Sequence, residues 1–258
     1  SADVNQFHSA GGVAAFIGSL LDGGYLFADV HTLLGKDLTI YRNNIEIKNN
    51  ELTWETPSKI LDQSIIRDSN NPFNSTGGLK LIDGNIGRGI IKTSSLKSSI
   101  THIEGHAIVF NNQEEVLEAF GLGKLNKDCI IVVRGQGPSA NGMPELHKLT
   151  SPLNVIQSKG YTVAILTDGR MSGASGSVPA VIHISPEAND GGMIGKILNN
   201  DKIKIDIDSG TFELQVDIKT LNERKSYQVP NISDGIGREL FKSFREKVKS
   251  VETGASIF

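Results

Sequence analysis

Residues 161–176, YTVAILTDGRMSGASG, join a run typical of a buried strand to a turn of small residues. The run is largely apolar and rich in β-branched side chains, which is the pattern of a strand buried on both faces. It breaks at Asp168, and the three glycines that follow permit positive φ angles and close approach of the backbone. The hydroxyl groups of Ser172 and Ser175 could then converge with bare N–H groups on one anionic ligand. Ordinary packing between a strand and a turn has the same pattern, so this stretch alone leaves both interpretations open.

Length and composition indicate a globular protein with a large core. The chain has 258 residues, of which 38% are hydrophobic and 21% charged. A formal net charge of -3 argues against nucleic acid as a partner, because binding of backbone phosphates needs a clustered basic face. No apolar stretch reaches the roughly 18 residues of a spanning helix, and no signal peptide is apparent. We therefore expect a cytoplasmic protein with no membrane or nucleic-acid partner.

Cys129 is the single cysteine of the chain, and it lies in the apolar run of residues 129–133. A single cysteine excludes disulfides within the chain and any all-cysteine metal or iron–sulfur site. Because its neighbours are apolar and β-branched, we predict that Cys129 is a buried core thiol.

The pattern of turn residues predicts two parts of unequal size. Residues 69–78 are punctuated by Ser, Asn, Pro and Gly, and unlike patterns lie on either side of them. We expect residues 1–70 to form a helical arm and linker, with helices at 13–21 and 27–34. Residues 71–258 are expected to form the main domain.

Periodicity predicts that this main domain is mixed α/β. Strand patterns occur at residues 79–82, 90–93, 105–110 and 129–133, and the clearest hairpin joins 202–207 to 211–216. Helical patterns occur at 112–120, 144–156 and 235–251, the last with Leu240, Phe241, Phe244 and Val248 facing inward. Taken alone, these elements fit an open sheet whose polar loops meet at one edge.

Two of the loops carry candidate site residues. Residues 134–147 follow one buried strand and residues 168–176 follow another, so we expect the two loops to lie side by side. The Glu145 carboxylate is a suitable ligand for Mg²⁺, although a solvated glutamate near a helix start has the same signature. Arg134 and Arg170 could bind carboxylate or phosphate through their planar guanidinium groups, or form surface salt bridges.

Spacing argues against two common reaction classes. The serines of residues 169–176 do not have the Gly-x-Ser-x-Gly spacing of a nucleophile elbow, which weakens a serine-hydrolase hypothesis. No Gly-Lys-Ser/Thr follows the glycine-rich segments, so a P-loop for nucleotide hydrolysis is absent. His183 lies in the apolar residues 181–184, where a core histidine is expected rather than a ligand.

Three motifs in this half of the chain resemble a known family. Residues 137–149, 167–176 and 183–188 are similar to the C-terminal half of the IlvD/Edd dehydratases, and the similarity runs through almost the whole chain. Residues 84–93 and 141–147 resemble the 6-phosphogluconate dehydratase branch. The dihydroxy-acid dehydratases typically have an Ala-Pro insertion in the first of these motifs and lack the histidine of the second.

The resemblance implies a fold that differs from an open sheet. The C-terminal part of these two-domain enzymes is a swivelling β/β/α domain, in which helices flank a closed β-barrel. The expected fold is therefore mixed α/β, with the barrel preceded by the short helical arm. The expected partners are the N-terminal domain of the same protein and a second copy in a homodimer.

The resemblance also implies a reaction and roles for individual residues. A sugar acid, here 6-phospho-D-gluconate of the Entner–Doudoroff pathway, loses the proton at C2 and the hydroxyl at C3 and becomes a 2-keto-3-deoxy acid. An iron–sulfur cluster acts as Lewis acid on the departing hydroxyl, and Mg²⁺ holds the carboxylate and the C2 oxygen. Ser172 would be the general base, as an alkoxide stabilised by nearby cations, and Glu145 a Mg²⁺ ligand. Substrate-binding roles are expected for Arg134, Asn141, His147, Arg170 and Ser175.

In one respect the chain departs from the family pattern. It carries neither a cluster motif nor a spare cysteine, because the cluster cysteines and the remaining Mg²⁺ ligands of the family belong to the N-terminal domain. We therefore expect a C-terminal domain with half of an active site, inactive without its N-terminal domain. Two alternatives stay open: the C-terminal domain of a dihydroxy-acid or other sugar-acid dehydratase, and a non-catalytic domain that binds anions or another subunit.

Overall fold

A computed structural model describes residues 2–94, 96, 100–172, 178–230, 235 and 237–258 of the chain. It divides the chain into two units, Ser1–Thr76 and Gly77–Phe258, which are described separately. None of the described helices is long and apolar enough to cross a membrane.

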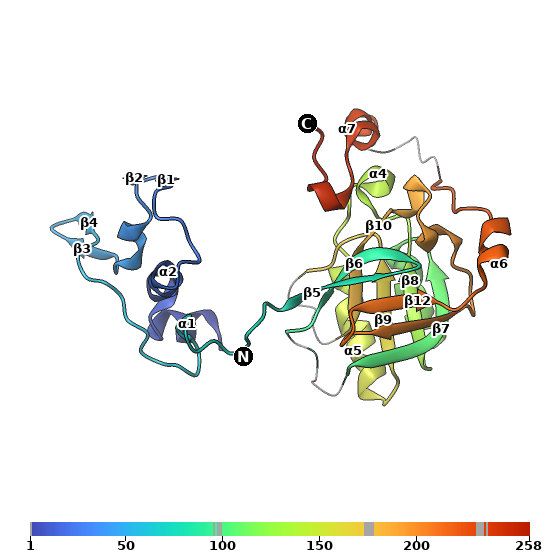
Figure 1. Ribbon diagram of the computed structural model, residues 1–258, viewed down its shortest axis with the longest axis horizontal. Coiled ribbons are helices and arrows are strands. Elements are labelled where there is room, and N and C mark those ends of the chain that lie inside the picture. The colour runs from blue at the N-terminus through green and yellow to red at the C-terminus, as the bar shows by residue number, and fades with distance from the viewer. Residues whose placement is uncertain (1, 95, 97–99, 173–177, 231–234, 236) are drawn as a thin grey trace. The chain divides into compact units, whose positions relative to one another are not determined.

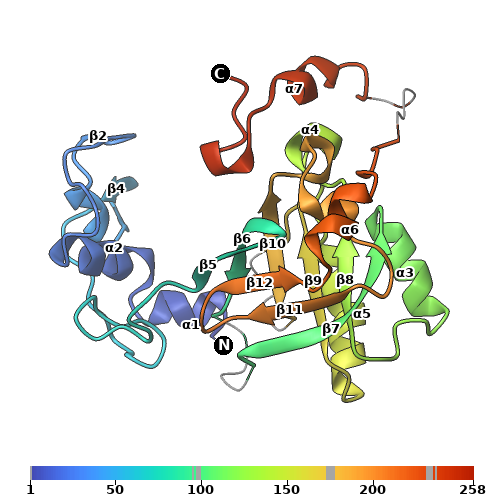
Figure 2. The same ribbon diagram turned by 45° about the vertical axis from the view of Figure 1, so that its right-hand side comes forward.

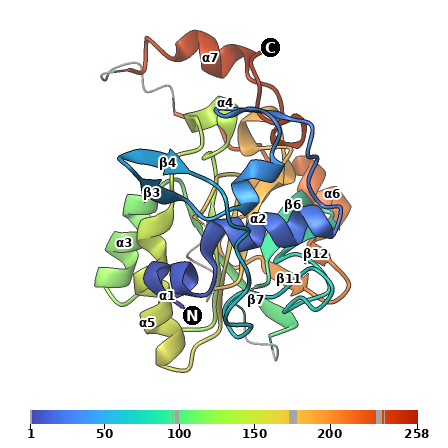
Figure 3. The ribbon, with the colours of Figure 1, turned by 90° about the vertical axis from the view of Figure 1, so that its left-hand side faces the viewer.

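The first unit contains two helices and two small hairpins (Figure 3). Its elements are α1 (Val4–Ser9), α2 (Gly12–Asp22), β1 (His31–Thr32), β2 (Gly35–Lys36), the 3₁₀ helix η1 (Thr39–Arg42), β3 (Glu46–Lys48) and β4 (Glu51–Thr53). A capping box begins α1, in which Asp3 accepts from the Gln6 N–H and the Gln6 side chain accepts from the Asp3 N–H. The helix expected at 13–21 is confirmed as α2.

The helix expected at residues 27–34 is wrong, because that segment ends in the β1–β2 hairpin. Leu33 is 99% exposed, so the apolar residues of the segment have no surface to pack against. The Thr32 hydroxyl accepts from the Leu34 N–H and donates to the Gly35 carbonyl, which gives the backbone a turn in place of a helix.

Eight strands of the second unit form a closed barrel (Figure 1). The order around the barrel is β10-β6-β5-β12-β11-β7-β8-β9. The strands are β5 (Leu79–Gly84), β6 (Gly87–Lys92), β7 (His102–Phe110), β8 (Cys129–Val133), β9 (Val163–Thr167), β10 (Ala180–Ser185), β11 (Lys202–Asp206) and β12 (Thr211–Leu214). The expected closed barrel in a mixed α/β fold is confirmed, as is the predicted hairpin of β11 and β12.

Strands β8 and β9 are buried at every position because they separate two apolar layers. Inside the barrel, Ile130 and Val132 pack with side chains of the other strands. Outside it, Ile131 and Val133 pack under α3 (Gln113–Gly121) and α5 (Thr150–Ser158), which lie against this side of the barrel in Figure 2. The apolar runs in the sequence are thus explained by burial on both faces.

Cys129 belongs to the outer layer and is buried, which confirms the prediction of a core thiol. Burial raises the pKa of this thiol to about 11. At neutral pH it is therefore protonated, and a protonated buried thiol is neither a nucleophile nor a metal ligand.

The helix expected at residues 144–156 has different bounds from those expected. A separate short helix, α4 (Pro138–Asn141), precedes it and ends at Gly142 in the left-handed conformation. Met143 also has a positive φ of 52°, so no helix can continue through it, and α5 starts only at Thr150.

At the C-terminus, the long helix expected at residues 235–251 is wrong. Gly235 and Gly237 have φ angles of 141° and 88°, and the chain forms only the short helix α7 (Lys242–Lys247). Leu240, Phe241 and Phe244 are exposed rather than facing a core. The remaining elements are α6 (Ile218–Glu223) and the 3₁₀ helices η2 (His147–Leu149), η4 (Ala188–Asp190), η5 (Met193–Lys196) and η6 (Val251–Thr253).

Candidate functional site

The loops that follow β8 and β9 lie side by side, as predicted. β7, β8 and β9 are parallel, so their following loops leave the barrel at the same end. The Asp168 carboxylate at the end of β9 accepts hydrogen bonds from the N–H groups of Gly135 (3.0 Å) and Gln136 (2.9 Å) after β8. It also accepts from the N–H of Ala188 (2.9 Å) after β10. One side chain therefore fixes three loops relative to one another.

Asp168 is fully buried, and two opposing effects act on its protonation. Burial raises the pKa of this carboxyl group, while the three backbone N–H donors favour the charged form. Gly169 allows the loops to approach this closely, because a Cβ atom at this position would lie 2.7 Å from the Cβ of Gln136.

Beyond this junction the structure brings Glu145, Arg170 and Ser172 together. Glu145 and Arg170 form an isolated parallel bridge between the two loops. The Ser172 N–H donates to Glu145 Oε1 at 2.6 Å, and Arg170 Nη1 lies 3.8 Å from Glu145 Oε2. Arg170 Nε donates to the Met143 carbonyl at 2.7 Å, which holds the guanidinium beside the carboxylate. These contacts confirm that the two predicted loops lie side by side.

A cleft of about 550 Å³ opens next to these residues. It is lined by Gly78, Leu79, Lys92, Ser94, Glu145, Arg170, Met171, Ser172, Val178, Ala180, Ile182 and His183. Most of its lining residues are apolar or uncharged, and its charged groups are the two cations Lys92 and Arg170 and the carboxylate of Glu145. Such a concave, mostly apolar surface with a few converging polar groups is typical of a small-molecule site.

His183 lines this cleft and is half-buried, so the expectation of a core histidine is wrong. Its backbone N–H donates to the Gly169 carbonyl at 2.9 Å, and its φ of 56° is unusual for a residue with a side chain. Burial, and next the positive charge of Arg170, lower the pKa of the imidazole. At neutral pH we therefore expect His183 to be uncharged.

Glu145 is the residue of this cleft best suited to bind a hard cation. Its side chain is 35% exposed, and among the described residues the Ser172 N–H is its one backbone donor, to Oε1. Carboxylate oxygens are the ligands that Mg²⁺ prefers. Among the residues that the structure describes, no group of three or more His, Cys, Asp or Glu side chains gathers to hold a metal.

The structure does not bring Arg134 to Glu145 and Ser172. Its Nη1 donates to the carbonyl oxygens of Gly195 (3.2 Å) and Ile197 (3.0 Å), and its guanidinium stacks on the Tyr227 ring at 4.4 Å. Nε donates to Asn111 Oδ1 at 3.3 Å. These contacts join the end of β8 to the segment before β11, which is a structural role.

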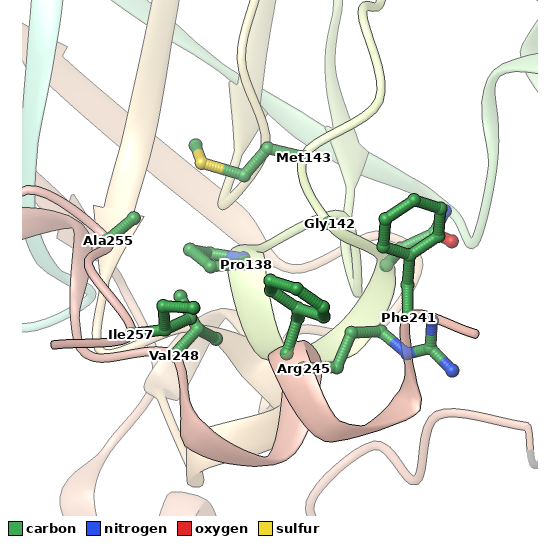
Figure 4. Close-up of a pocket in the computed structure, with 10 residues that line it drawn as sticks. Pro138, Gly142, Met143, Phe241, Arg245, Val248, Ala255 and Ile257 are labelled. Carbon is green, nitrogen blue, oxygen red and sulfur yellow. The ribbon is translucent and has the colours of Figure 1, made fainter. Parts of the chain in front are cut away.

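Asn141 lies at a second cavity of about 470 Å³, between α4 and the C-terminal segment (Figure 4). Its amide group donates to Gln136 Oε1 at 3.2 Å, and its Oδ1 accepts from Arg238 at 3.0 Å. In Figure 4, Pro138 and Met143 border the same space as Phe241, Val248 and Ile257. Neither Glu145 nor Ser172 lines this cavity.

The two other predicted residues also lie apart from the cleft or outside the described chain. His147 is exposed at the start of η2 and is not among the residues that line the cleft. Ser175 lies within residues 173–177, which the structure does not describe.

Sequence reasoning missed two buried carboxylates that hold the loops. The sequence marks Asp168 only as the end of a strand and Glu187 only as part of a motif. Glu187 accepts from the N–H groups of Ser139 (2.8 Å) and Ala140 (3.0 Å) at the start of α4, and burial raises the pKa of its carboxyl group. The available signal is an acidic residue one or two positions after a strand, where loop N–H groups need acceptors.

Comparison with known proteins identifies relatives over the whole chain. Phosphogluconate dehydratases of Escherichia coli K12 and Pseudomonas aeruginosa are 44% and 43% identical to it over 259 residues, covering 99% and 100% of the chain. The chain spans only 43% of the length of either relative. A dihydroxy-acid dehydratase of Helicobacter hepaticus is 33% identical over 99% of the chain and 44% of its own length.

A model of one protein family matches most of the sequence as well. The match covers residues 64–255 and carries the description dihydroxy-acid/6-phosphogluconate dehydratase C-terminal. It includes the whole barrel together with the cleft of Glu145, Arg170 and Ser172. The chain therefore belongs to the dihydroxy-acid/6-phosphogluconate dehydratase family.

Proposed function

We propose that this chain supplies the C-terminal half of the active site of a hydro-lyase that dehydrates 6-phospho-D-gluconate to 2-dehydro-3-deoxy-6-phosphogluconate. The observation that carries the proposal is the contact of the Ser172 N–H with the Glu145 carboxylate, at the edge of a cleft that also presents Arg170. The names and the identities of the relatives favour phosphogluconate over a dihydroxy acid as substrate.

In the proposed reaction the C2–H and C3–O bonds break, water leaves, and the resulting enol takes up a proton at C3 to become the ketone. Ser172, as the alkoxide, takes the C2 proton on Oγ and becomes a neutral hydroxyl group. A serine hydroxyl is a weak acid, so its alkoxide needs cationic charge nearby. Arg170 supplies part of that charge, and the backbone contact with Glu145 holds Ser172 at the cleft.

The proposal assigns one cofactor contact to this chain. Glu145 fits a Mg²⁺ ligand, since its carboxylate faces the cleft and one oxygen is left free by the Ser172 N–H. When bound, Mg²⁺ would stabilise negative charge on the substrate carboxylate and C2 oxygen. Cys129 does not fit an iron–sulfur cluster, because it is buried, protonated and remote from solvent. Cluster ligands would have to lie in the part of the relatives that this chain does not span.

The proposal includes a partner domain and an assembly. The relatives are more than twice as long as the matched segment, so we propose that the remaining part completes the site from the other side of the cleft. Assembly as a homodimer in the cytoplasm is proposed from the family resemblance.

The experiment measures the Ser172→Ala variant in a protein of the relatives' full length, in which this chain is joined to the part of the enzyme that it does not span. We expect wild-type protein to dehydrate 6-phosphogluconate in preference to a dihydroxy acid. We expect the variant to fold normally but to lose about 10²- to 10⁴-fold in the exchange of the C2 proton with solvent deuterium. Ser151→Ala, at an exposed serine in α5, is the matched control and should exchange at the wild-type rate. Exchange at the wild-type rate in Ser172→Ala would exclude Ser172 as the base.

A further inference from the structure

Lys92 is a positively charged residue of the cleft that has no role in the proposed reaction. It is the last residue of β6, and the preceding Ile91 points into the barrel core. Because side chains alternate along a strand, Lys92 projects from the outer face, where it lines the cleft and is half-buried. Its position is set by the barrel rather than by a loop.

The charge of Lys92 is not compensated within the described part of the chain. No described residue gives its ammonium group an ion pair or a hydrogen bond, whereas the other cation of the cleft, Arg170, lies against Glu145. Two positive side chains and one carboxylate leave the cleft with a net positive charge. A partly desolvated cation without a partner costs free energy, so an anionic ligand would be favoured at this position.

The strand register places Lys92 away from the other charged residues of the cleft. Val181 of β10 pairs with Ile91, so Lys92 lies level with Ala180. His183, three residues further along β10, is hydrogen-bonded to Gly169, from which the chain continues to Arg170 and Ser172. At roughly 3.3 Å per residue, the step along β10 from Ala180 to His183 is about 10 Å or less, because the strand is irregular after Ile182.

The cleft therefore has two polar ends with apolar residues between them. Met171, Ala180 and Ile182 are among these lining residues and offer no charge to a ligand. A molecule that fits must carry an anion far from its reacting carbons. An extended six-carbon sugar acid with a phosphate at C6 has this form, with the carboxylate end at Glu145 and Ser172 and the phosphate at the other end.

We propose that Lys92 binds the terminal phosphate of the substrate and so distinguishes phosphorylated from unphosphorylated sugar acids. This proposal rests on the proposed function and deepens it. Ser94, which is exposed and also lines the cleft, offers a hydroxyl to the same phosphate. The contribution of Lys92 should be to substrate affinity, because the phosphate takes no part in the bonds that change.

The test compares Lys92→Met with wild type in the complete protein, using 6-phosphogluconate and gluconate as substrates. Loss of one charge-assisted hydrogen bond predicts that kcat/KM for 6-phosphogluconate falls about 10- to 100-fold, mainly through KM. The kcat/KM for gluconate should be the same in Lys92→Met and wild type. Inorganic phosphate should compete with substrate in wild type and much more weakly in the variant. Lys92→Arg should keep most of the preference, and Lys204→Met, at an exposed barrel lysine, should keep all of it.

The outcomes separate the two proposals. If wild type acts on 6-phosphogluconate but Lys92→Met loses equally on both substrates, Lys92 contacts their shared part and the phosphate assignment fails. It also fails if the variant retains full activity and full inhibition by phosphate. If wild type does not dehydrate 6-phosphogluconate at all, the proposed function fails, and the assignment of Lys92 fails with it.

Discussion

Asp168→Asn is the substitution that tests most directly how the site is held together. The side chain keeps its size, but one acceptor oxygen becomes an NH₂ donor. In the native structure Oδ2 accepts from Gly135 and Ala188, while Oδ1 accepts from Gln136. In one orientation the asparagine oxygen takes the Oδ2 position, and the new NH₂ group then faces the Gln136 N–H. In the opposite orientation the NH₂ group faces the N–H groups of Gly135 and Ala188.

The size of the effect follows from these contacts. At least one backbone N–H and one hydrogen of the new NH₂ group lose their partners inside a fully buried site. Each unsatisfied buried group costs about 1–3 kcal/mol. Removal of a buried charge offsets part of this, because the carboxylate itself is costly to desolvate. We expect a net loss of about 2–4 kcal/mol in the free energy of unfolding of the barrel.

The assay must report on the barrel unit. The single tryptophan, Trp54, lies in the unit Ser1–Thr76, so its fluorescence would follow the other unit. Amide hydrogen exchange measured along the barrel strands reports the required free energy, and exchange at Gln136 reports the local contact. Asp208→Asn, at an exposed turn, is the matched control and should change stability by about 0.5 kcal/mol or less. If Asp168→Asn behaves like this control, desolvation of the carboxylate cancels its hydrogen bonds, and Asp168 does not hold the loops.

Three further predictions concern other parts of the chain. Arg134→Met should destabilise the barrel by about 2–4 kcal/mol in urea denaturation, because two carbonyl groups lose a charged donor, whereas Arg88→Met at an exposed ion pair should cost about 1 kcal/mol or less. The pKa of His183 is lowered in the folded protein, so the unfolded chain binds a proton at this residue more readily. The stability that the neutral imidazole contributes is therefore lost as pH falls below about 6.5. His183→Asn, which tolerates a positive φ, should lose less stability than wild type between neutral and mildly acidic pH. Limited proteolysis should cut first within residues 69–78, and equal resistance of the first unit and the barrel would contradict that boundary.

Most of the barrel strands could be predicted from the sequence, because burial on both faces leaves a clear apolar signature. Residues 129–133 match β8 at both ends, and the hairpin of β11 and β12 shows the alternation of strands with one buried face. Closure of the barrel left no such signature and was expected only from the family resemblance. Pairing of β12 with β5, which completes it, joins segments far apart in the chain, and local periodicity carries no information on such a contact.

The helix predictions failed where apolar residues with helical spacing stay about half exposed or more. Residues 240–248 have helical spacing, yet Phe241 and Phe244 are about half exposed and only a short helix forms. Spacing predicts a helix only when another element covers the apolar face, and in this segment glycines with positive φ break the chain before a longer helix can form.

The candidate site shows the same limit for charged residues. Glu145, Asp168 and Glu187 are all acidic residues in loops at one end of the barrel, and the sequence does not distinguish them. In the structure, both oxygens of Asp168 and both of Glu187 accept from backbone N–H groups, so these carboxylates are committed to the fold. Glu145 accepts one backbone N–H and turns its other oxygen toward Arg170 and the cleft. Of these three side chains, Glu145 alone can therefore bind a ligand without breaking the loops that position it, and this difference depends on hydrogen bonds to residues remote in sequence.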